Sequence, residues 1–261
     1  MEIKPFYETQ LCKIYNGDCI SVMNNLIQCG VKVDKILTSP PYNIIRPNIS
    51  DRGYDEYNDG MSNEDYIKWT LEIFSCYDKL LSENGCVLYN MSYGTENTEL
   101  MNLTISEILK NTDFTIADIL VWKKNSAMPN NVSSNKMTRI CEFIYAFCRR
   151  NEFNTFTSNK KIIGQRNSGQ PIYEIKYNFF QAKNNDGSID LNKATFSTEF
   201  VLELINRYVK DTDVVLDNFV GTGTTIEACM TKNIQSIGIE LSKSQCEYIK
   251  KRLSDFQFSL F

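Results

Sequence analysis

Histidine is missing from all 261 residues of this chain. Imidazole is the common side chain for proton transfer near neutral pH and a frequent metal ligand. Its absence excludes Ser-His-Asp hydrolysis, HExxH zinc chemistry and zinc deamination in its usual His-containing form. Any catalysis by this chain therefore has to proceed without an imidazole group.

Disulfide, zinc-site and membrane patterns are missing as well. The nine cysteines are scattered, with no C-x-x-C pair, so we expect no disulfide framework and no metal site. No run of about 18 apolar residues supports a membrane span. Residues 1–15 carry Glu2, Lys4, Glu8 and Lys13, which the apolar core of a signal peptide would lack. We therefore expect a cytoplasmic protein with no membrane partner.

Bulk composition is that of an ordinary globular protein. Hydrophobic residues make up 42% and charged residues 23% of the chain, and the formal net charge is −4. A chain of this length can bury one good core, so we expect one compact domain with an insertion. The net charge by itself does not indicate a nucleic-acid partner.

Short apolar runs alternate with amphipathic stretches along most of the chain. This alternation predicts an α/β fold with a mostly parallel sheet. We expect strands over 33–37, 85–91, 114–122, 140–147, 214–217 and 235–240. We expect helices over 64–81, 99–110, 200–209, 224–231 and 242–252. Ser62, with Asp65 three residues on, should cap the first of these helices, and Ser242 the last.

A glycine-containing loop joins the strand at 214–217 to the helix at 224–231, and residues 217–225 read D-N-F-V-G-T-G-T-T. Gly221 and Gly223 allow a tight turn and a close approach of the backbone to a ligand. Glu240 ends the next strand, where it can accept hydrogen bonds from both hydroxyls of a ribose. Ile226 replaces the third glycine of the dinucleotide fingerprint, and no Gly-Lys-Ser/Thr of a P-loop follows. The alternative is a glycine-rich turn without a ligand.

A proline-locked loop follows the strand at 33–37, and residues 38–43 read T-S-P-P-Y-N. Pro40 and Pro41 fix the backbone and supply no N–H group, so the loop is rigid. These residues suit a planar ligand that bears an NH₂ group: Tyr42 can stack on its ring, while the Ser39 hydroxyl and the Pro40 carbonyl accept the two amino hydrogens. The alternative is a plain strand exit with a packed tyrosine.

Together the two loops resemble the amino-DNA methyltransferases. Residues 39–42 match the S-P-P-Y form of motif IV, and residues 217–224 match motif I. Motif IV before motif I is typical of the permuted β class. The resemblance implies a Rossmann-like methyltransferase fold with circularly permuted motif order and an inserted target-recognition region. It also implies S-adenosylmethionine as the cofactor and no metal.

The resemblance implies roles for individual residues. It gives the catalytic loop as Ser39, Pro40, Pro41 and Tyr42. It gives the cofactor site as Asp217, Phe219, Gly221, Gly223, Thr224 and Glu240. Asp18, in the N-G-D element at 16–18, is expected near the target base, and Asn43 is expected to support the loop. The chain departs from the family at Cys141, where a His often precedes Glu142, and at 194–197, where the usual His-Pro is absent.

The implied reaction is methylation of the exocyclic amine of a base that is flipped out of DNA. S-P-P-Y usually accompanies cytosine N4, so we expect cytosine, with adenine N6 as the alternative. An RNA or protein-amide methyltransferase is a more distant alternative, which Ser39 and the motif order disfavour. A non-catalytic nucleic-acid-binding module is disfavoured by the intact loops. A cognate restriction endonuclease and a homodimer are left open.

Basic residues gather in one part of the chain. Between 123 and 183 there are eleven Lys and Arg residues against three Glu. This surplus predicts a phosphate-binding face, with a solvated loop as the alternative. The candidate DNA-binding residues are Lys160, Lys161, Arg166 and Asn167. We accordingly divide the chain into a catalytic half (1–122), a basic target-recognition region that includes the strand at 140–147 (123–195), and a cofactor-binding half (196–261).

Overall fold

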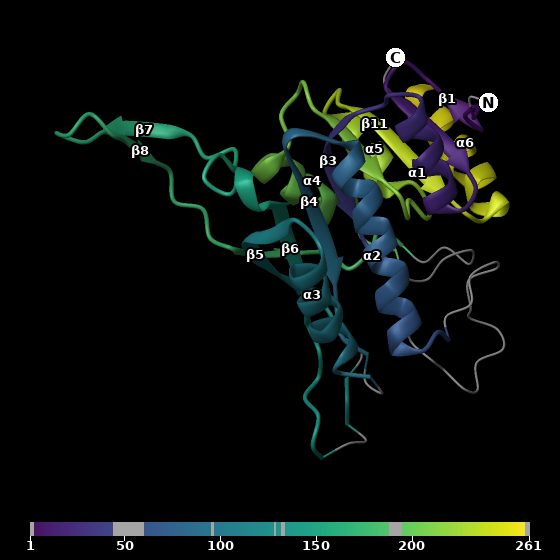
Figure 1. Cartoon of the computed structure of the whole chain (residues 1–261), viewed down its shortest axis with the longest axis horizontal. Helices are drawn as coiled ribbons and strands as arrows, with labels where there is room; N and C mark the ends of the chain where they lie inside the picture. Colours follow the sequence, from purple (N-terminus) through teal and green to yellow (C-terminus); the bar gives the residue numbers. More distant parts are fainter. Residues whose placement is uncertain are drawn as a thin grey trace.

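The computed structural model describes residues 3–43, 60–94, 97–127, 129–131, 134–187 and 195–258. Its centre is a nine-stranded sheet in the order β1-β2-β11-β10-β3-β4-β6-β5-β9 (Figure 1). The strands are β1 (Tyr7–Glu8), β2 (Cys12–Asn16), β3 (Val33–Thr38), β4 (Leu81–Met91), β5 (Phe114–Lys124), β6 (Cys141–Arg149), β9 (Phe179–Ala182), β10 (Val214–Asp217) and β11 (Gln235–Glu240).

The sheet is mostly parallel, as predicted. Strands β2, β11, β10, β3 and β4 run parallel to one another. Strand β6 is antiparallel to both of its neighbours, β4 and β5, and β9 joins β5 in parallel. Strand β1 pairs with β2 in antiparallel fashion at the edge. The predicted Rossmann-like α/β class is therefore confirmed.

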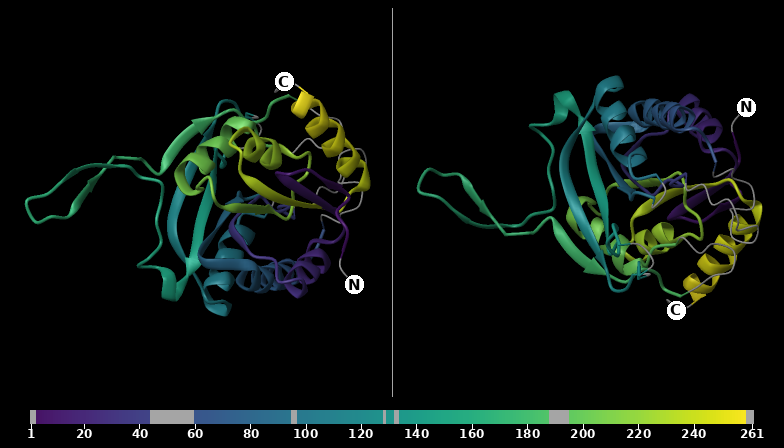
Figure 2. Two further views of the ribbon diagram at one scale, coloured as in Figure 1. Left: turned by 90° about the horizontal axis from the view of Figure 1, so that it is seen from above. Right: turned by 90° about the horizontal axis from the view of Figure 1, so that it is seen from below.

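Helices cover both faces of this sheet. They are α1 (Cys19–Gln28), α2 (Asn63–Leu80), α3 (Leu100–Asn111), α4 (Thr198–Tyr208), α5 (Thr224–Thr231) and α6 (Lys243–Phe258), and a 3₁₀ turn follows β6 (Arg150–Glu152). Figure 2 shows α1, α2 and α3 on one face and α4, α5 and α6 on the other. Because helices bury both faces, the central strands read as nearly continuous apolar runs, such as Ile36-Leu37 and Val87-Leu88.

Helix starts follow the capping chemistry that the sequence predicts. The Ser62 hydroxyl accepts from the Asp65 N–H at 3.1 Å at the start of α2. The Ser242 hydroxyl accepts from the Gln245 N–H at 3.3 Å at the start of α6. These side chains satisfy N–H groups that the first helical turn leaves without partners.

Some elements were not predicted. Helix α1 buries only Cys19, Val22, Met23 and Leu26, too short a stripe to be distinguished from a loop by period alone. Strands β1, β2 and β9 are short, and the N-G-D element follows β2 instead of preceding the first strand. Strand β4 begins at Leu81, before the predicted start at 85, and continues directly from α2.

One hairpin leaves the body of the protein. Strands β7 (Ile162–Gln165) and β8 (Pro171–Tyr173) pair only with each other among the described residues. Residues 160–177, which we call the arm, extend well beyond the sheet and its helices (Figures 1 and 2). The division at 122 and 195 stays a prediction, since one sheet takes strands from all three segments.

No helix in the described ranges is both long and apolar enough to cross a membrane.

Candidate active site

The two loops meet because the strands that lead into them are neighbours. Strand β3 and strand β10 are parallel and adjacent, so both loops leave the same edge of the sheet. Behind the loops, the Thr38 hydroxyl donates to Asp217 Oδ1 at 2.8 Å and the Thr225 hydroxyl donates to Oδ2 at 2.6 Å. The fully buried Asp217 carboxylate therefore joins β3, β10 and α5 at the junction of the two loops.

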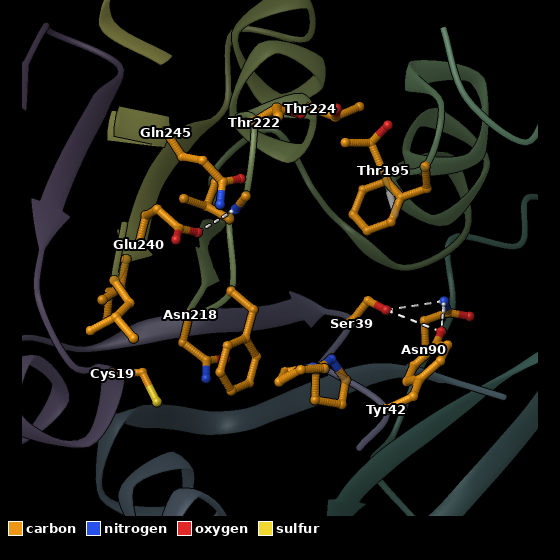
Figure 3. A pocket seen from close by; sticks show the side chains of 18 of the residues that line it. Cys19, Ser39, Tyr42, Asn90, Thr195, Asn218, Thr222, Thr224, Glu240 and Gln245 are labelled. Atoms are coloured by element: carbon orange, nitrogen blue, oxygen red, sulfur yellow. Dashed lines mark hydrogen bonds between the residues drawn. The ribbon is translucent and has the colours of Figure 1, made fainter. Parts of the chain in front are cut away.

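A cavity of about 540 Å³ lies between the loops (Figure 3). This volume is within the range of small-molecule sites. The predicted site residues on its wall are Asp18, Ser39, Pro40, Pro41, Tyr42, Phe219, Gly221, Thr224 and Glu240. Ser39 and Tyr42 lie at one end of the cavity and Glu240 at the other (Figure 3).

Three predicted residues support the cavity from behind and do not line it. Asp217 is the buried link described above. Gly223 has φ 88 and begins α5, and a Cβ at this position would lie 3.1 Å from Ile249 Cγ1. Asn43 has φ 52 and exchanges two hydrogen bonds with the backbone of Met61, so it fixes the exit of the proline loop.

At the glycine-loop end, Glu240 is held by backbone groups. Its Oε2 accepts from the Gly221 N–H and its Oε1 from the Ser242 N–H, both at 2.9 Å. Each oxygen keeps a second lone pair for a ligand. Burial raises the pKa of Glu240 to about 7. Nearby, the buried Thr222 hydroxyl has no hydrogen-bond partner among the described residues, so this wall is prepared for a polar ligand.

Asp18 lies at the Glu240 end and not at the proline-loop end. It follows β2, which pairs with β11, and its carboxylate caps α1 by accepting from the Ser21 N–H at 2.9 Å. Strands β11 and β10 separate β2 from β3. A contact between Asp18 and the target base stays a prediction, and the strand order places Asp18 nearer to Glu240 than to the proline loop.

The proline loop is held in place by burial and by a hydrogen bond from α2. Pro40 and Pro41 are buried, and the Tyr66 hydroxyl donates to the Pro41 carbonyl at 2.8 Å. Between the two ends of the cavity, Phe219 packs against Trp69, with ring centroids 5.5 Å apart. Trp69 was not among the predicted site residues, although it contributes an aromatic wall.

A buried polar network surrounds residues 39–42, which we call the tetrad, and most of this network was not predicted from the sequence. Asn90 Nδ2 donates to the Tyr42 hydroxyl at 2.9 Å and to Glu142 Oε2 at 2.9 Å. Lys124 Nζ donates to Glu142 Oε1. Asn90 could have been noticed as a polar residue inside the apolar strand β4, because a buried amide needs partners.

The predicted phosphate-binding face stays a prediction, because only part of the basic surplus is available for it. Arg149 is engaged by Asp78 and Glu152, and Lys124 by Glu142, so structural ion pairs use part of the charge. The predicted DNA-binding residues Lys160, Lys161, Arg166 and Asn167 are exposed on the arm, away from the cavity. Among the described residues, no group of His, Cys, Asp and Glu side chains could hold a metal ion.

Comparison with known proteins agrees with this geometry. A family model described as DNA methylase, of the N6/N4 type, matches residues 33–251. The chain is 26% identical over 280 residues to the type II methyltransferase M2.MboI of Moraxella bovis, covering 97% of this chain and 92% of that protein. The PvuII DNA methyltransferase, described as cytosine-N4-specific, shares the fold with a TM-score of 0.69 at 17% identity, covering 97% of this chain and 93% of that one.

The M1.HpyAVI–SAM complex shares the fold with a TM-score of 0.62 at 23% identity, covering 93% of this chain and 100% of that one. The family match spans most of the chain, and the S-P-P-Y loop precedes the glycine loop in sequence while meeting it in space. The chain therefore belongs to the DNA methylase family of N6/N4 amino-methyltransferases, in its β class.

Proposed function

We propose that this protein transfers a methyl group from S-adenosylmethionine to the exocyclic amine of a flipped DNA base, with cytosine N4 as the preferred acceptor. One observation carries the proposal: the rigid Ser39–Tyr42 loop and the Gly221–Glu240 wall face each other across one cavity. This arrangement supports an amine acceptor site and a cofactor site that are close enough for a direct transfer.

The residues of the Glu240 end fit S-adenosylmethionine. Glu240 can accept from both ribose hydroxyls, and the unpartnered Thr222 hydroxyl can bond a polar group of the ligand. Asp18 and Glu240 make this end acidic, which favours the positive charge of the cofactor. The cofactor would supply an electrophilic sulfonium methyl group and leave as S-adenosylhomocysteine, and the methylated amine would release one N–H proton to solvent. M1.HpyAVI, solved with this cofactor, shares the fold and supports the assignment.

The residues of the tetrad end fit a planar amine. An exocyclic amine is a weak nucleophile, because its lone pair delocalises into the ring. Ser39 and the Pro40 carbonyl would accept its two hydrogens, which draws the nitrogen towards a tetrahedral geometry and localises the lone pair. Tyr42 would hold the ring by stacking. The target atom is inaccessible within a duplex, so the base has to flip into the cavity.

Serine at position 39 favours cytosine over adenine. The cytosine-N4-specific PvuII enzyme shares the fold and supports this preference. Adenine N6 is the second candidate, since Ser39 and the Pro40 carbonyl could accept from either amine. The type II names of the relatives support a modification enzyme paired with a restriction endonuclease. A homodimer stays a prediction from the family resemblance.

We also propose that the arm binds DNA. Its tip, residues 165–170, reads Q-R-N-S-G-Q and is exposed throughout. Arginine, asparagine and glutamine are side chains that read base edges, and the major groove admits a two-stranded ribbon. Lys160 and Lys161 lie at the root, where they could contact phosphates. A two-stranded ribbon that packs against nothing else has only marginal stability in water. The side chains of Ile162 and Ile163 are 65% and 66% exposed, which favours a partner that covers them.

Both ends of the arm are hydrogen-bonded to the body of the protein, which suits an element that contacts DNA bases. The Asn159 N–H donates to the Arg207 carbonyl at 2.7 Å, and Asn159 Nδ2 donates to the Val209 carbonyl at 2.6 Å. On the returning segment that follows β8, Arg207 Nη1 donates to the Tyr177 carbonyl at 2.9 Å. Both roots are therefore fixed to the end of α4.

The test is long-read sequencing of DNA from a methylation-free host that expresses the protein. We expect N4-methylcytosine in one short sequence context. Tyr42→Ala is the matched variant: it should bind S-adenosylmethionine normally and lose most of the methylation, because the stacking face is gone. N6-methyladenine would select the second candidate, and unmodified DNA from a folded, cofactor-binding protein would contradict the proposal.

A further inference from the structure

The carboxylate of Glu142 lies beside the tetrad without a role in the chemistry described so far. Glu142 is on β6 and is only 8% exposed. Its Oε1 accepts from Lys124 Nζ. Its Oε2 accepts from the Tyr42 hydroxyl at 3.1 Å and from Asn90 Nδ2 at 2.9 Å. A buried carboxylate needs such partners, but Tyr42 is itself a residue of the tetrad.

The direction of each hydrogen bond can be assigned from the donors available. An ionised carboxylate only accepts, so Tyr42 uses its single hydroxyl hydrogen towards Glu142. Ser39 Oγ and the Tyr42 hydroxyl lie 3.2 Å apart, and one of them has to donate. Since the Tyr42 hydrogen is already used, Ser39 is the donor in this contact.

Asn90 favours the same orientation of the Ser39 hydroxyl hydrogen. Its Nδ2 lies 3.3 Å from Ser39 Oγ and cannot accept the Ser39 hydrogen, because an amide nitrogen only donates; its two hydrogens are shared among Ser39, Tyr42 and Glu142. The Ser39 hydrogen is thus directed to Tyr42, and what Ser39 presents to the cavity is a lone pair. If the hydrogen could turn towards the cavity, Ser39 would donate to the amine nitrogen and occupy the lone pair that has to attack.

We propose that Glu142 is a positioning residue, which acts through the Tyr42 hydroxyl to fix Ser39 as a hydrogen-bond acceptor for the amine. This inference rests on the proposed amine methylation. The same contacts hold the plane of the Tyr42 ring. Lys124, with its side chain 26% exposed, offsets the cost of burying the Glu142 charge.

The test is a double-mutant cycle with Tyr42→Phe, Glu142→Gln and the double variant in the full-length protein. The substrate is duplex DNA that contains the sequence identified by long-read sequencing. Tyr42→Phe keeps the stacking ring and removes only the hydroxyl. Each single variant should lower kcat about 10- to 100-fold, the range expected for a hydrogen bond to a charged group, and leave KM for DNA nearly unchanged.

The decisive readout is the double variant. If Glu142 acts only through the Tyr42 hydroxyl, the double variant should lose no more than the larger single loss. Glu107→Gln is the matched control, because Glu107 also pairs with a lysine, Lys110, but lies on α3 outside the cavity. It should keep the kcat of the unmodified protein.

Additive losses, or a loss confined to KM, would overturn the inference. If Glu142→Gln does not fold, as judged by thermal unfolding, Tyr42→Phe decides alone: an unchanged kcat overturns the inference and a loss in kcat supports it. Normal methylation by the unmodified protein with no loss in Tyr42→Phe would overturn this inference and leave the proposed function standing. No methylation by the unmodified protein would overturn both.

Discussion

At the scale of single residues, burial decides what the acids of the site can do. Glu240 accepts two backbone N–H groups, yet desolvation outweighs these bonds and raises its pKa to about 7. In the protein without ligand, Glu240 is therefore protonated below this pH. Accepting from both hydroxyls of a ribose requires the ionised form.

This predicts that S-adenosylmethionine binding depends on pH through Glu240. The affinity should rise about tenfold between pH 6 and pH 8, since the ionised fraction of a group with this pKa rises by about that factor. Isothermal calorimetry at several pH values measures the effect. Glu240→Gln should bind more weakly and remove the Glu240 part of the dependence. An affinity that is equal at both pH values would contradict the assigned role.

At the scale of elements, the start of α5 shows how a residue can matter to the cofactor without lining the cavity. Gly223 has φ 88, a left-handed conformation that costs other residues about 1–2 kcal/mol. An added Cβ would also lie 3.1 Å from Ile249 on α6. The loop conformation that aims Gly221 and Thr222 at the cavity therefore depends on glycine at this position.

Gly223→Ala should accordingly weaken S-adenosylmethionine binding as well as lower the free energy of unfolding. The control is Gly30→Ala, because Gly30 has φ 72 with nothing within 4 Å of the added Cβ and lies outside the cavity wall. This control should lose stability and keep normal cofactor affinity. Calorimetry and urea unfolding separate the two effects. Equal affinity in both variants would show that the loop tolerates the change.

The arm is the second element with a testable role. Arg166→Ala should relax the sequence specificity at one position, because arginine at the tip would contact a base. Lys160→Ala should weaken DNA binding at all sequences and reduce its salt dependence by about one charge. Lys232→Ala, at an exposed lysine after α5, is the control and should do neither. Sequencing of modified DNA and binding at several salt concentrations provide the measurements. An unaltered methylation pattern in Arg166→Ala would exclude reading by that side chain.

At the scale of the whole molecule, the Asp217 carboxylate joins the two halves of the chain. Burial raises its pKa from the usual 3.8 to about 6, despite hydrogen bonds from Thr38, Thr225 and the Phe219 N–H. A raised carboxyl pKa means that the folded protein binds the proton more tightly than the unfolded chain does. Its contribution to stability is complete below about pH 4 and is lost as the pH rises through 6.

Asp217→Asn tests this link, because asparagine does not titrate. Relative to this variant, the unmodified protein should lose about 2 kcal/mol of unfolding free energy between pH 4 and pH 7, which is most of the total that the pKa change represents. Urea unfolding across this range measures the difference. A constant difference between the two proteins would show that Asp217 titrates normally.

The sequence by itself determined the two loops and the elements that lead into them. Proline at 40 and 41 and glycine at 221 and 223 restrict or permit backbone angles locally, whatever surrounds them. The alternation of apolar runs likewise determined most strands and helices, since period and capping are local properties. The position of both loops at one edge of the sheet also followed, because the carboxyl ends of parallel strands lie at one edge.

Only the tertiary structure decided which polar groups act together. Glu142 reaches Tyr42 across 100 residues of sequence, and Asn90 reaches Ser39 across 51. It also placed Asp18 at the Glu240 end of the cavity, engaged Arg149 with Asp78, and left the arm exposed. The physical reason is that burial and hydrogen bonding depend on strand order and on distance in space, which no local pattern of residues specifies.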